Sequence, residues 1–266
     1  MSSIDIFHYN QVMKWTKSFY SKQYEWGHFL EQEVEAQHHE KVVLINQLAG
    51  NGQKQILELG AGGGHNAAAA ADLGHIVYAI EMVPAAAQRA QNLASDSRAG
   101  EMVVIEGDFY EISLPQQFDV VCYWDGFGIG NDQEQRRLLK RVASWLKPDG
   151  CAIIECYTPW YAASVVGKQW QVGDAIRRYD FDARHCRWLD TWWSINDAED
   201  KVQQSLRCYS PADLQLLLQG TGLSLQSVLP GGTMDWEKKQ YLKQTPLAKA
   251  MFYTAKLVRS GEASPE

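Results

Sequence analysis

The sequence has no run of 18 or more apolar residues, and its N-terminus has neither a basic start nor an apolar stretch. We therefore predict no membrane span and no signal peptide. The five cysteines are an odd number without a C-x-x-C pair, which indicates reduced thiols in a cytoplasmic protein. No long basic block is present and the formal net charge is −7, which argues against nonspecific binding to nucleic acid or to an anionic membrane.

Local patterns for metal binding and for nucleophilic catalysis are also missing. No spacing of His, Cys, Asp or Glu matches a metal site, and no Ser-His-Asp or Cys-His arrangement has local support. His8, His28 and His185 are weak candidates for a general base, because isolated histidines are more often surface or packing residues. His38 and His39 are flanked by acids, so we expect them on a solvated helix face.

The most informative stretch is residues 55–81, QILELGAGGGHNAAAAADLGHIVYAIE. An apolar run at 56–59 is short enough to be a buried strand, and a glycine-rich turn follows at 60–64. The alanine-rich segment 66–73 strongly favours a helix. A second apolar run ends at Glu81, which completes a strand–turn–helix–strand unit typical of nucleotide-binding sheets.

Each part of this unit has a chemical use. Glycines let the backbone approach a ligand, and the helix that follows directs free N–H groups and the positive end of its dipole toward it. Glu81 lies about 20 residues after the turn, where a carboxylate accepts hydrogen bonds from ribose hydroxyls. A dinucleotide fingerprint requires a third glycine at the position of His65. An NAD-dependent oxidoreductase is therefore an alternative, although this sequence lacks that glycine.

Strands alternate with helices as far as residue 157, which indicates a parallel sheet. We predict an α/β fold with a Rossmann-like, seven-stranded and mostly parallel sheet that has helices on both faces. Its strands are expected at 56–59, 76–80, 101–105, 118–124, 151–157, 222–229 and 250–258. Between the fifth and sixth strands, short alternating segments at 175–179, 187–193 and 202–209 predict an antiparallel β insertion.

An acid, Glu58, stands two residues before the first glycine, so the turn reads E-x-G-x-G-x-G. Glu81, the E-G-D turn at 106–108 and the L-K-P-D-G turn at 146–150 follow in the same order as in the class I S-adenosylmethionine (SAM) methyltransferases, which this chain therefore resembles. The segment 207–223 is similar to the late helix and strand of that family.

This resemblance implies SAM as the cofactor and S-adenosylhomocysteine as the product. It implies that Asp108 holds the adenine amino group and that Met82 and Phe109 enclose the ring. It also implies that the methyl acceptor approaches Trp124 and Asp125. The cofactor-binding residues that we expect are Glu58, Gly60, Ala61, Gly62, Gly64, Glu81, Met82, Gly107, Asp108, Phe109 and Trp124. The Asn/Asp-Pro-Pro-Tyr signature of methyltransferases acting on nucleobase or amide nitrogens is absent, which disfavours DNA and glutamine as substrates.

The resemblance covers about residues 41–158 and 207–258. An insertion after the fifth strand looks like the small-molecule branch of the family, in which the insertion and N-terminal helices form a lid. We therefore divide the chain into an N-terminal helical lid segment (1–40), a SAM-binding core (41–158), an antiparallel lid insertion (159–209) and a completion of the core by a helix and two strands (210–266).

Methyl transfer from a sulfonium is an in-line displacement, to which alignment and desolvation contribute much of the acceleration. A general base is needed only when the acceptor must lose a proton. Asp125 is our first candidate for a catalytic base and Tyr157 the second. Capping of the loop before Gly126 explains Asp125 equally well.

Tryptophans outside the expected core are the best clue to the substrate, because aromatic walls bind flat apolar molecules or cationic amines. We expect Trp26, Trp160 and Trp193 to contact the substrate together with Asp125 and Tyr157. Packing of the lid onto the core is the alternative role for these tryptophans.

The sequence thus predicts a SAM-dependent methyltransferase that acts on an N or O atom of a small molecule, such as an aromatic compound or an amine. An NAD-dependent oxidoreductase and a catalytically silent SAM-binding subunit are the alternatives. We expect a small-molecule substrate and neither nucleic acid nor membrane as a partner, while the sequence leaves the oligomeric state open.

Overall fold

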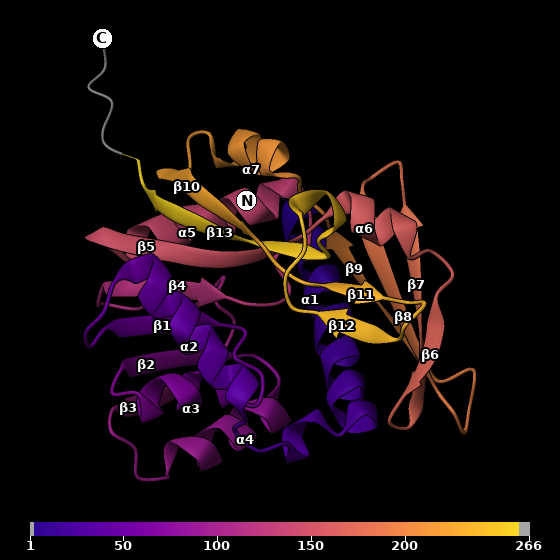
Figure 1. The fold of residues 1–266 in the computed structure, drawn as a ribbon, viewed down its shortest axis with the longest axis horizontal. Coiled ribbons are helices and arrows are strands. Elements are labelled where there is room, and N and C mark those ends of the chain that lie inside the picture. The colour runs from indigo at the N-terminus through magenta and orange to yellow at the C-terminus, as the bar shows by residue number, and fades with distance from the viewer. Residues whose placement is uncertain (1–2, 261–266) are drawn as a thin grey trace.

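The computed structural model describes residues 3–260, with side chains from Trp15 onward, and contains two principal sheets (Figure 1). The larger is a seven-stranded sheet in the order β10-β13-β5-β4-β1-β2-β3. Its strands are β1 (Gln55–Leu59), β2 (Ile76–Glu81), β3 (Glu101–Glu106), β4 (Phe118–Tyr123), β5 (Leu146–Tyr157), β10 (Leu223–Pro230) and β13 (Phe252–Arg259). Only β13 runs antiparallel to its neighbours, so the predicted Rossmann-like, mostly parallel sheet is confirmed.

Helices cover both faces of this sheet, because its strands bury alternate residues on opposite sides. Ile56 packs with the helices α2 (Ala36–Ala49), α3 (His65–Asp72) and α4 (Pro84–Ala94). Leu57, the next residue of β1, packs with α5 (Asp132–Trp145) and α7 (Pro211–Leu218) on the other face. Five consecutive alanines of α3 are buried, and their small side chains allow close approach to the sheet and to neighbouring helices.

The second sheet is the antiparallel insertion that the sequence predicts, although it has one more strand than expected. Its strands, in spatial order, are β6 (Gln169–Val172), β7 (Ala175–Asp182), β8 (Arg187–Ser194) and β9 (Lys201–Arg207). The short helix α6 (Pro159–Ser164) leads from β5 into it. β6 escaped prediction because it is a four-residue edge strand with a polar alternation.

A further small hairpin, β11 (Thr233–Asp235) with β12 (Gln240–Leu242), lies between β10 and β13 and was not expected. A 3₁₀ turn, η2 (Leu247–Lys249), follows it. Strands of three residues carry almost no periodic signal, so only tertiary contacts reveal this hairpin. One such contact is the tilted pair of indole rings of Trp170 and Trp236, whose centroids are 5.0 Å apart.

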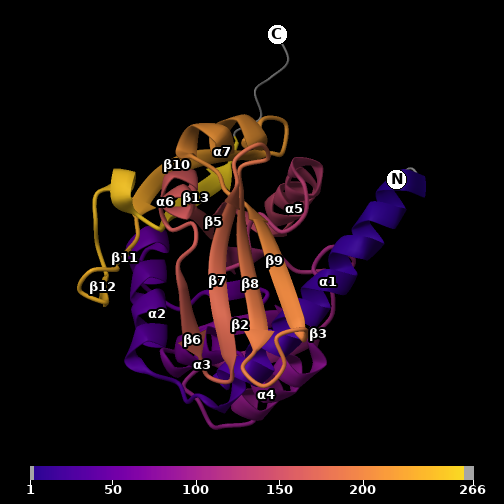
Figure 2. The same ribbon diagram turned by 90° about the vertical axis from the view of Figure 1, so that its right-hand side faces the viewer.

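The N-terminal helix α1 (Ser3–Gly27) runs alongside β9 of the insertion (Figure 2) and is followed by a 3₁₀ turn, η1 (Phe29–Glu31). Lys22 of α1 forms an ion pair with Asp200 at 2.7 Å. Gln204 of β9 donates a hydrogen bond to the hydroxyl of Tyr20 at 2.6 Å. These contacts join α1 to the insertion. Among residues 3–260, no helix is sufficiently long and apolar to cross a membrane.

Candidate active site

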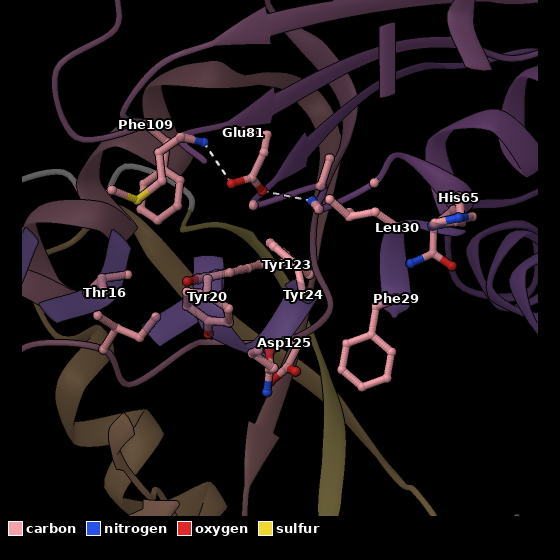
Figure 3. A pocket seen from close by; sticks show the side chains of 18 of the residues that line it. Thr16, Tyr20, Tyr24, Phe29, Leu30, His65, Glu81, Phe109, Tyr123 and Asp125 are labelled. Carbon is pink, nitrogen blue, oxygen red and sulfur yellow. Dashed lines mark hydrogen bonds between the residues drawn. The ribbon is translucent and has the colours of Figure 1, made fainter. Parts of the chain in front are cut away.

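A cavity of about 440 Å³ opens at the carboxyl ends of β1, β2, β4 and β5. α1 and the strands β7 and β8 of the insertion line its other side (Figure 3). Ligands of open α/β sheets bind at this edge, because the loops that follow parallel strands converge there. The volume lies in the usual range for a small-molecule site, about 300–1,000 Å³.

The glycine-rich turn between β1 and α3 lines one end of the cavity with Gly60, Ala61 and Gly62. Gly60 and Gly62 have positive φ angles of 62° and 57°, a backbone conformation that L side chains rarely adopt. The Ala61 N–H donates to the Ile80 carbonyl at 2.9 Å, which ties the turn to the end of β2. The turn therefore offers closely approachable backbone to a ligand, as the sequence predicts.

Gly64 has a different task, because it does not line the cavity. It is the N-cap of α3 with φ of 82°. A Cβ at this position would lie 2.7 Å from both the Ala90 Cβ and the Met102 Cε. Gly64 thus permits close packing of α3 against α4 and β3, the task that a dinucleotide fingerprint gives to its third glycine.

Glu81, at the end of β2, is buried and accepts three backbone hydrogen bonds. Its Oε2 accepts from Gly62 N–H at 2.8 Å, and its Oε1 accepts from Met82 and Val83 N–H at 2.8 and 2.7 Å. Burial raises the pKa of Glu81, against the three N–H donors that favour the carboxylate. Glu81 therefore fixes the glycine turn itself, and Oε2 keeps acceptor capacity toward the cavity.

Met82 and Phe109 both line the cavity where the resemblance implies the adenine ring. Asp108 does not line it, and its carboxylate accepts a hydrogen bond from Tyr110 N–H at 2.8 Å. Gly107 also lies outside the lining and donates its N–H to the Glu81 carbonyl at 2.8 Å. These two residues shape the loop that carries Phe109.

Two arginines of helix α5 bind the backbone of the loop that carries Phe109. The Nε of Arg141 donates to the Phe109 carbonyl at 2.8 Å, and its Nη2 donates to the carbonyl of Ile112. Arg137 donates to the Tyr110 carbonyl at 3.1 Å. The two guanidinium groups therefore bind three backbone carbonyls within residues 109–112, a role that no sequence motif signals.

Glu58 and Trp124, two further predicted cofactor residues, point away from the cavity into the helix-covered face that contains α2. Glu58 forms a side-chain hydrogen bond with Asn66, which does line the cavity. Burial raises the pKa of Glu58 from 4.5 to about 8. The Lys41 ammonium lies 4.9 Å from the centre of the Trp124 ring. Glu58 thus contributes to the site by binding Asn66 and does not itself line the cavity.

Asp125 and Tyr157, the two predicted catalytic residues, meet in the cavity. The hydroxyl of Tyr157, at the end of β5, donates to Oδ1 of Asp125 at 3.0 Å. The side chain of Asp125 is exposed to the cavity, and the protein around the cavity partly removes its carboxyl group from water, which raises its pKa. Burial also raises the pKa of Tyr157, so the phenol remains a proton donor at neutral pH.

Five tyrosines from four elements surround Asp125, and only Tyr157 among them was expected from the sequence as a site residue. They are Tyr20 and Tyr24 of α1, Tyr123 of β4, Tyr157 of β5 and Tyr179 of β7. The Tyr20 and Tyr24 rings are 6.1 Å apart, as the i, i+4 spacing on a helix allows. A Cβ at Gly62 would lie 3.1 Å from the Tyr24 hydroxyl, which shows that Tyr24 covers the glycine turn. The crowding of aromatic residues before position 30 was the available signal.

Arg177 of β7 is the other main feature that sequence reasoning missed. Its Nε and Nη2 form a bidentate pair with Asp190 of β8, with distances of 2.7–3.0 Å. Its guanidinium carbon lies 4.6 Å from the centre of the Tyr179 ring and 5.1 Å from that of Trp192. Arg177, Tyr179 and Trp192 all line the cavity, so the insertion contributes directly to the site.

The three tryptophans expected to bind substrate lie outside the cavity lining. Trp193 stands on the face of β8 opposite to Trp192, because side chains alternate along a strand. Trp26 is buried behind Trp192, within the same apolar cluster. Trp160 packs under the insertion and donates its indole N–H to the Leu247 carbonyl at 2.9 Å.

The histidine candidates divide in a similar way. His28 and His185 are exposed and pair with Asp174 and Asp182, away from the cavity, while the side chain of His8 is outside the described part. His38 lines the cavity and stacks on His65 with centroids 5.2 Å apart. The expectation of a solvated helix face is therefore wrong for His38, because the chain that enters α2 folds against the glycine turn.

Comparison with known proteins agrees with this geometry. Residues 56–150 match the family model of the methyltransferase domain. Over 109 residues the chain is 31% identical to a cypemycin N-terminal methyltransferase from Streptomyces sp., a match that covers 40% of this chain and 43% of that protein. The chain therefore spans less than half the length of this curated relative.

Solved structures share the fold over most of the chain. The CcbJ methyltransferase from Streptomyces caelestis is 20% identical with a TM-score of 0.67, covering 85% of this chain and 91% of its own. The glycopeptide N-methyltransferase MtfA is 16% identical with a TM-score of 0.58, covering 86% and 93%. Residues 56–150, which contain the glycine turn and Glu81, therefore match a methyltransferase domain, and the solved structures show that the chain has a Rossmann-like methyltransferase fold.

Proposed function

We propose that this protein transfers a methyl group from SAM to an N or O atom of a small-molecule acceptor. The observation that carries this proposal is the single cavity that contains the glycine turn, Glu81 and the Asp125–Tyr157 pair. SAM held by the turn would present its methyl group toward this pair, since both lie at the same edge of the sheet.

In this proposal the described side chains bind, orient and exclude water. Gly60 and Gly62 receive the amino-acid part of SAM, Glu81 accepts a ribose hydroxyl, and Met82 with Phe109 encloses the adenine. SAM supplies an activated methyl group, so alignment and exclusion of water provide much of the acceleration. Asp125, held by the Tyr157 hydroxyl, takes a proton from the acceptor where the reaction requires it.

We infer that residues 1–40 and 159–209 form the two parts of a lid over a SAM-binding core. The support is that Tyr24 of α1 covers the glycine turn and that Arg177 and Trp192 of the insertion line the cavity. Residues 41–158 with 210–266 would then form the catalytic core. The ion pair between Lys22 and Asp200 joins the two parts of the lid.

Relatives of this chain support both acceptor atoms. The glycopeptide N-methyltransferase MtfA transfers to nitrogen, and the cypemycin N-terminal methyltransferase acts at an N-terminus, as their names state. Another solved structure of this fold is the mitomycin 7-O-methyltransferase MmcR.

Incubation of the protein with methyl-labelled SAM and a bacterial metabolite extract tests the proposal. We expect S-adenosylhomocysteine to accumulate and a labelled small molecule to be found by mass spectrometry. Calorimetry should show SAM binding by the same preparation. SAM binding without labelled product would indicate a catalytically silent subunit, and binding of NADH in place of SAM would overturn the assignment.

A further inference from the structure

Carboxylate groups outnumber arginine and lysine side chains in the lining of the cavity. Three carboxylates line it, those of Glu81, Asp125 and Glu134, whereas the charge of Arg177 is offset by its bidentate partner Asp190. Asp125 forms no ion pair with a lysine, arginine or histidine within the side chains that the structure describes. The acceptor end of the cavity therefore holds a carboxylate without an ion-pair partner among the described side chains; Arg177 acts on it electrostatically but is itself paired with Asp190.

The walls around Asp125 are aromatic. Tyr20, Tyr123 and Tyr157 lie beside it, and both Tyr20 and Tyr123 place their hydroxyl oxygens about 3 Å from a Cβ built on Gly126, the next residue. Aromatic rings attract cations through the negative potential of their faces, and the attraction increases when water is excluded. A carboxylate among such rings is complementary to an organic ammonium ion.

We propose that the methyl acceptor is an amine, which enters the cavity as an ammonium ion and binds between Asp125 and the surrounding tyrosines. This inference rests on the proposed methyl-transfer function and narrows its acceptor class. An alcohol or a phenol would gain only a hydrogen bond from this carboxylate, without the charge attraction that an ammonium ion adds, and a carboxylate would be repelled by it.

The proton balance of the reaction is consistent with this site. An ammonium nitrogen has no free electron pair, so it first gives one N–H proton to the Asp125 carboxylate. The released lone pair then forms the new N–C bond while the C–S bond of SAM breaks, which leaves S-adenosylhomocysteine and a methylated ammonium. Asp125 returns its proton to water when the products leave, so one proton is released per turnover.

Two features of the site favour the first proton transfer. The cationic sulfonium of SAM repels the ammonium ion and lowers the pKa of that ion. Partial removal from water raises the pKa of Asp125, so its carboxylate holds a proton more readily than one in bulk water. The Tyr157 hydroxyl donates a hydrogen bond to Oδ1 of Asp125 and so orients the carboxylate, which leaves Oδ2 to take the proton.

Binding of two matched probes tests the acceptor class. Benzylamine and benzyl alcohol share a ring and a chain length but differ in charge at neutral pH. We expect calorimetry on the protein saturated with S-adenosylhomocysteine to show at least about tenfold tighter binding of benzylamine. Asp125→Asn should remove this preference while leaving the affinity for S-adenosylhomocysteine unchanged. Asp149→Asn makes the same charge change on an exposed turn and should keep the preference.

The outcomes separate this inference from the proposed function. Equal binding of the two probes, tighter binding of the alcohol, or undetectable binding of both would overturn the amine proposal while S-adenosylhomocysteine binding still supports a methyltransferase. Retention of the preference in Asp125→Asn would also overturn it. Failure of the protein to bind S-adenosylhomocysteine would instead remove the proposed function itself. A labelled N-methyl product from benzylamine would support both.

Discussion

At the scale of single residues, the absence of a Cβ atom at Gly62 matters in two ways. It permits a left-handed backbone conformation, and it leaves space at the edge of the cavity. The φ angle of Gly62 is 57°, and an added methyl group would lie 3.1 Å from the Tyr24 hydroxyl. A left-handed conformation costs a non-glycine residue about 1–2 kcal/mol. We expect Gly62→Ala to weaken SAM binding about tenfold or more, as measured by calorimetry. Gly52→Ala is the control, because Gly52 has φ of 97° but open space around it.

Glu58 predicts a dependence of stability on pH. Its pKa is 4.5 in an ordinary environment and about 8 when buried here. Between these pH values the folded protein keeps a proton that the unfolded chain has lost, so stability falls as pH rises, by about 1.4 kcal/mol for each pH unit. The effect is absent below the lower pKa and complete above the upper one.

Glu58→Gln removes this titration and keeps a side chain that can hydrogen-bond Asn66. We expect the variant to gain several degrees in Tm over the wild type as pH rises toward 8, with little difference near pH 5. Thermal unfolding across this range measures it. Glu101→Gln, an exposed change on β3, should follow the wild type at every pH. Parallel curves for Glu58→Gln and the wild type would show that Glu58 is ionised in the folded state.

Sequence reasoning located those site residues whose position follows from the local chain. Gly62 and Asp125 come directly after strands, and parallel strands bring such positions to one edge. Arg177 was missed because its role depends on pairing across β7 and β8. Strand alternation separates Trp192 from Trp193 but does not say which face meets the cavity. The burial of Asp190 against Arg177 decides it.

At the scale of elements, helix α5 acts as a support for the loop that carries Phe109. Arg141 donates to the carbonyls of Phe109 and Ile112, and hydrogen bonds from charged donors contribute about 1.5–3 kcal/mol. We expect Arg141→Ala to weaken SAM binding about tenfold, because Phe109 would lose its fixed position. Lys140→Ala alters an exposed neighbour on the same helix and serves as the control. An unchanged Kd for SAM in Arg141→Ala would limit α5 to a packing role.

The strands of the large sheet and the strands β7, β8 and β9 were predicted with ends that differ by a few residues at most, because their apolar patterns are strong. The exceptions are informative. The strand expected to begin at residue 151 extends back to Leu146, through the L-K-P-D-G turn. β6, β11 and β12 are short and mostly polar, so they form only because neighbouring elements supply their hydrogen bonds and apolar contacts.

At the scale of the whole molecule, the cavity lies between the seven-stranded sheet on one side and α1 with β7 and β8 on the other. We expect S-adenosylhomocysteine to slow amide hydrogen exchange in residues 15–31 and 175–194 as well as in the glycine turn. Exchange in α7, on the far face of the sheet, should not change. Protection confined to residues 60–66 and 81–83 would show that the cofactor binds without engaging the lid.

The Tyr24 hydroxyl over Gly62 has a kinetic consequence. In the proposed lid arrangement, each catalytic cycle would open the α1 contacts twice, once to admit SAM and once to release S-adenosylhomocysteine. We therefore expect a rapid first turnover followed by a slower steady state, visible by rapid quenching as a burst of product. Lys22→Ala would break the 2.7 Å ion pair with Asp200 and should shorten the residence time of the product. Lys22→Ala, which removes a contact between α1 and the insertion, would then raise the turnover number of the enzyme.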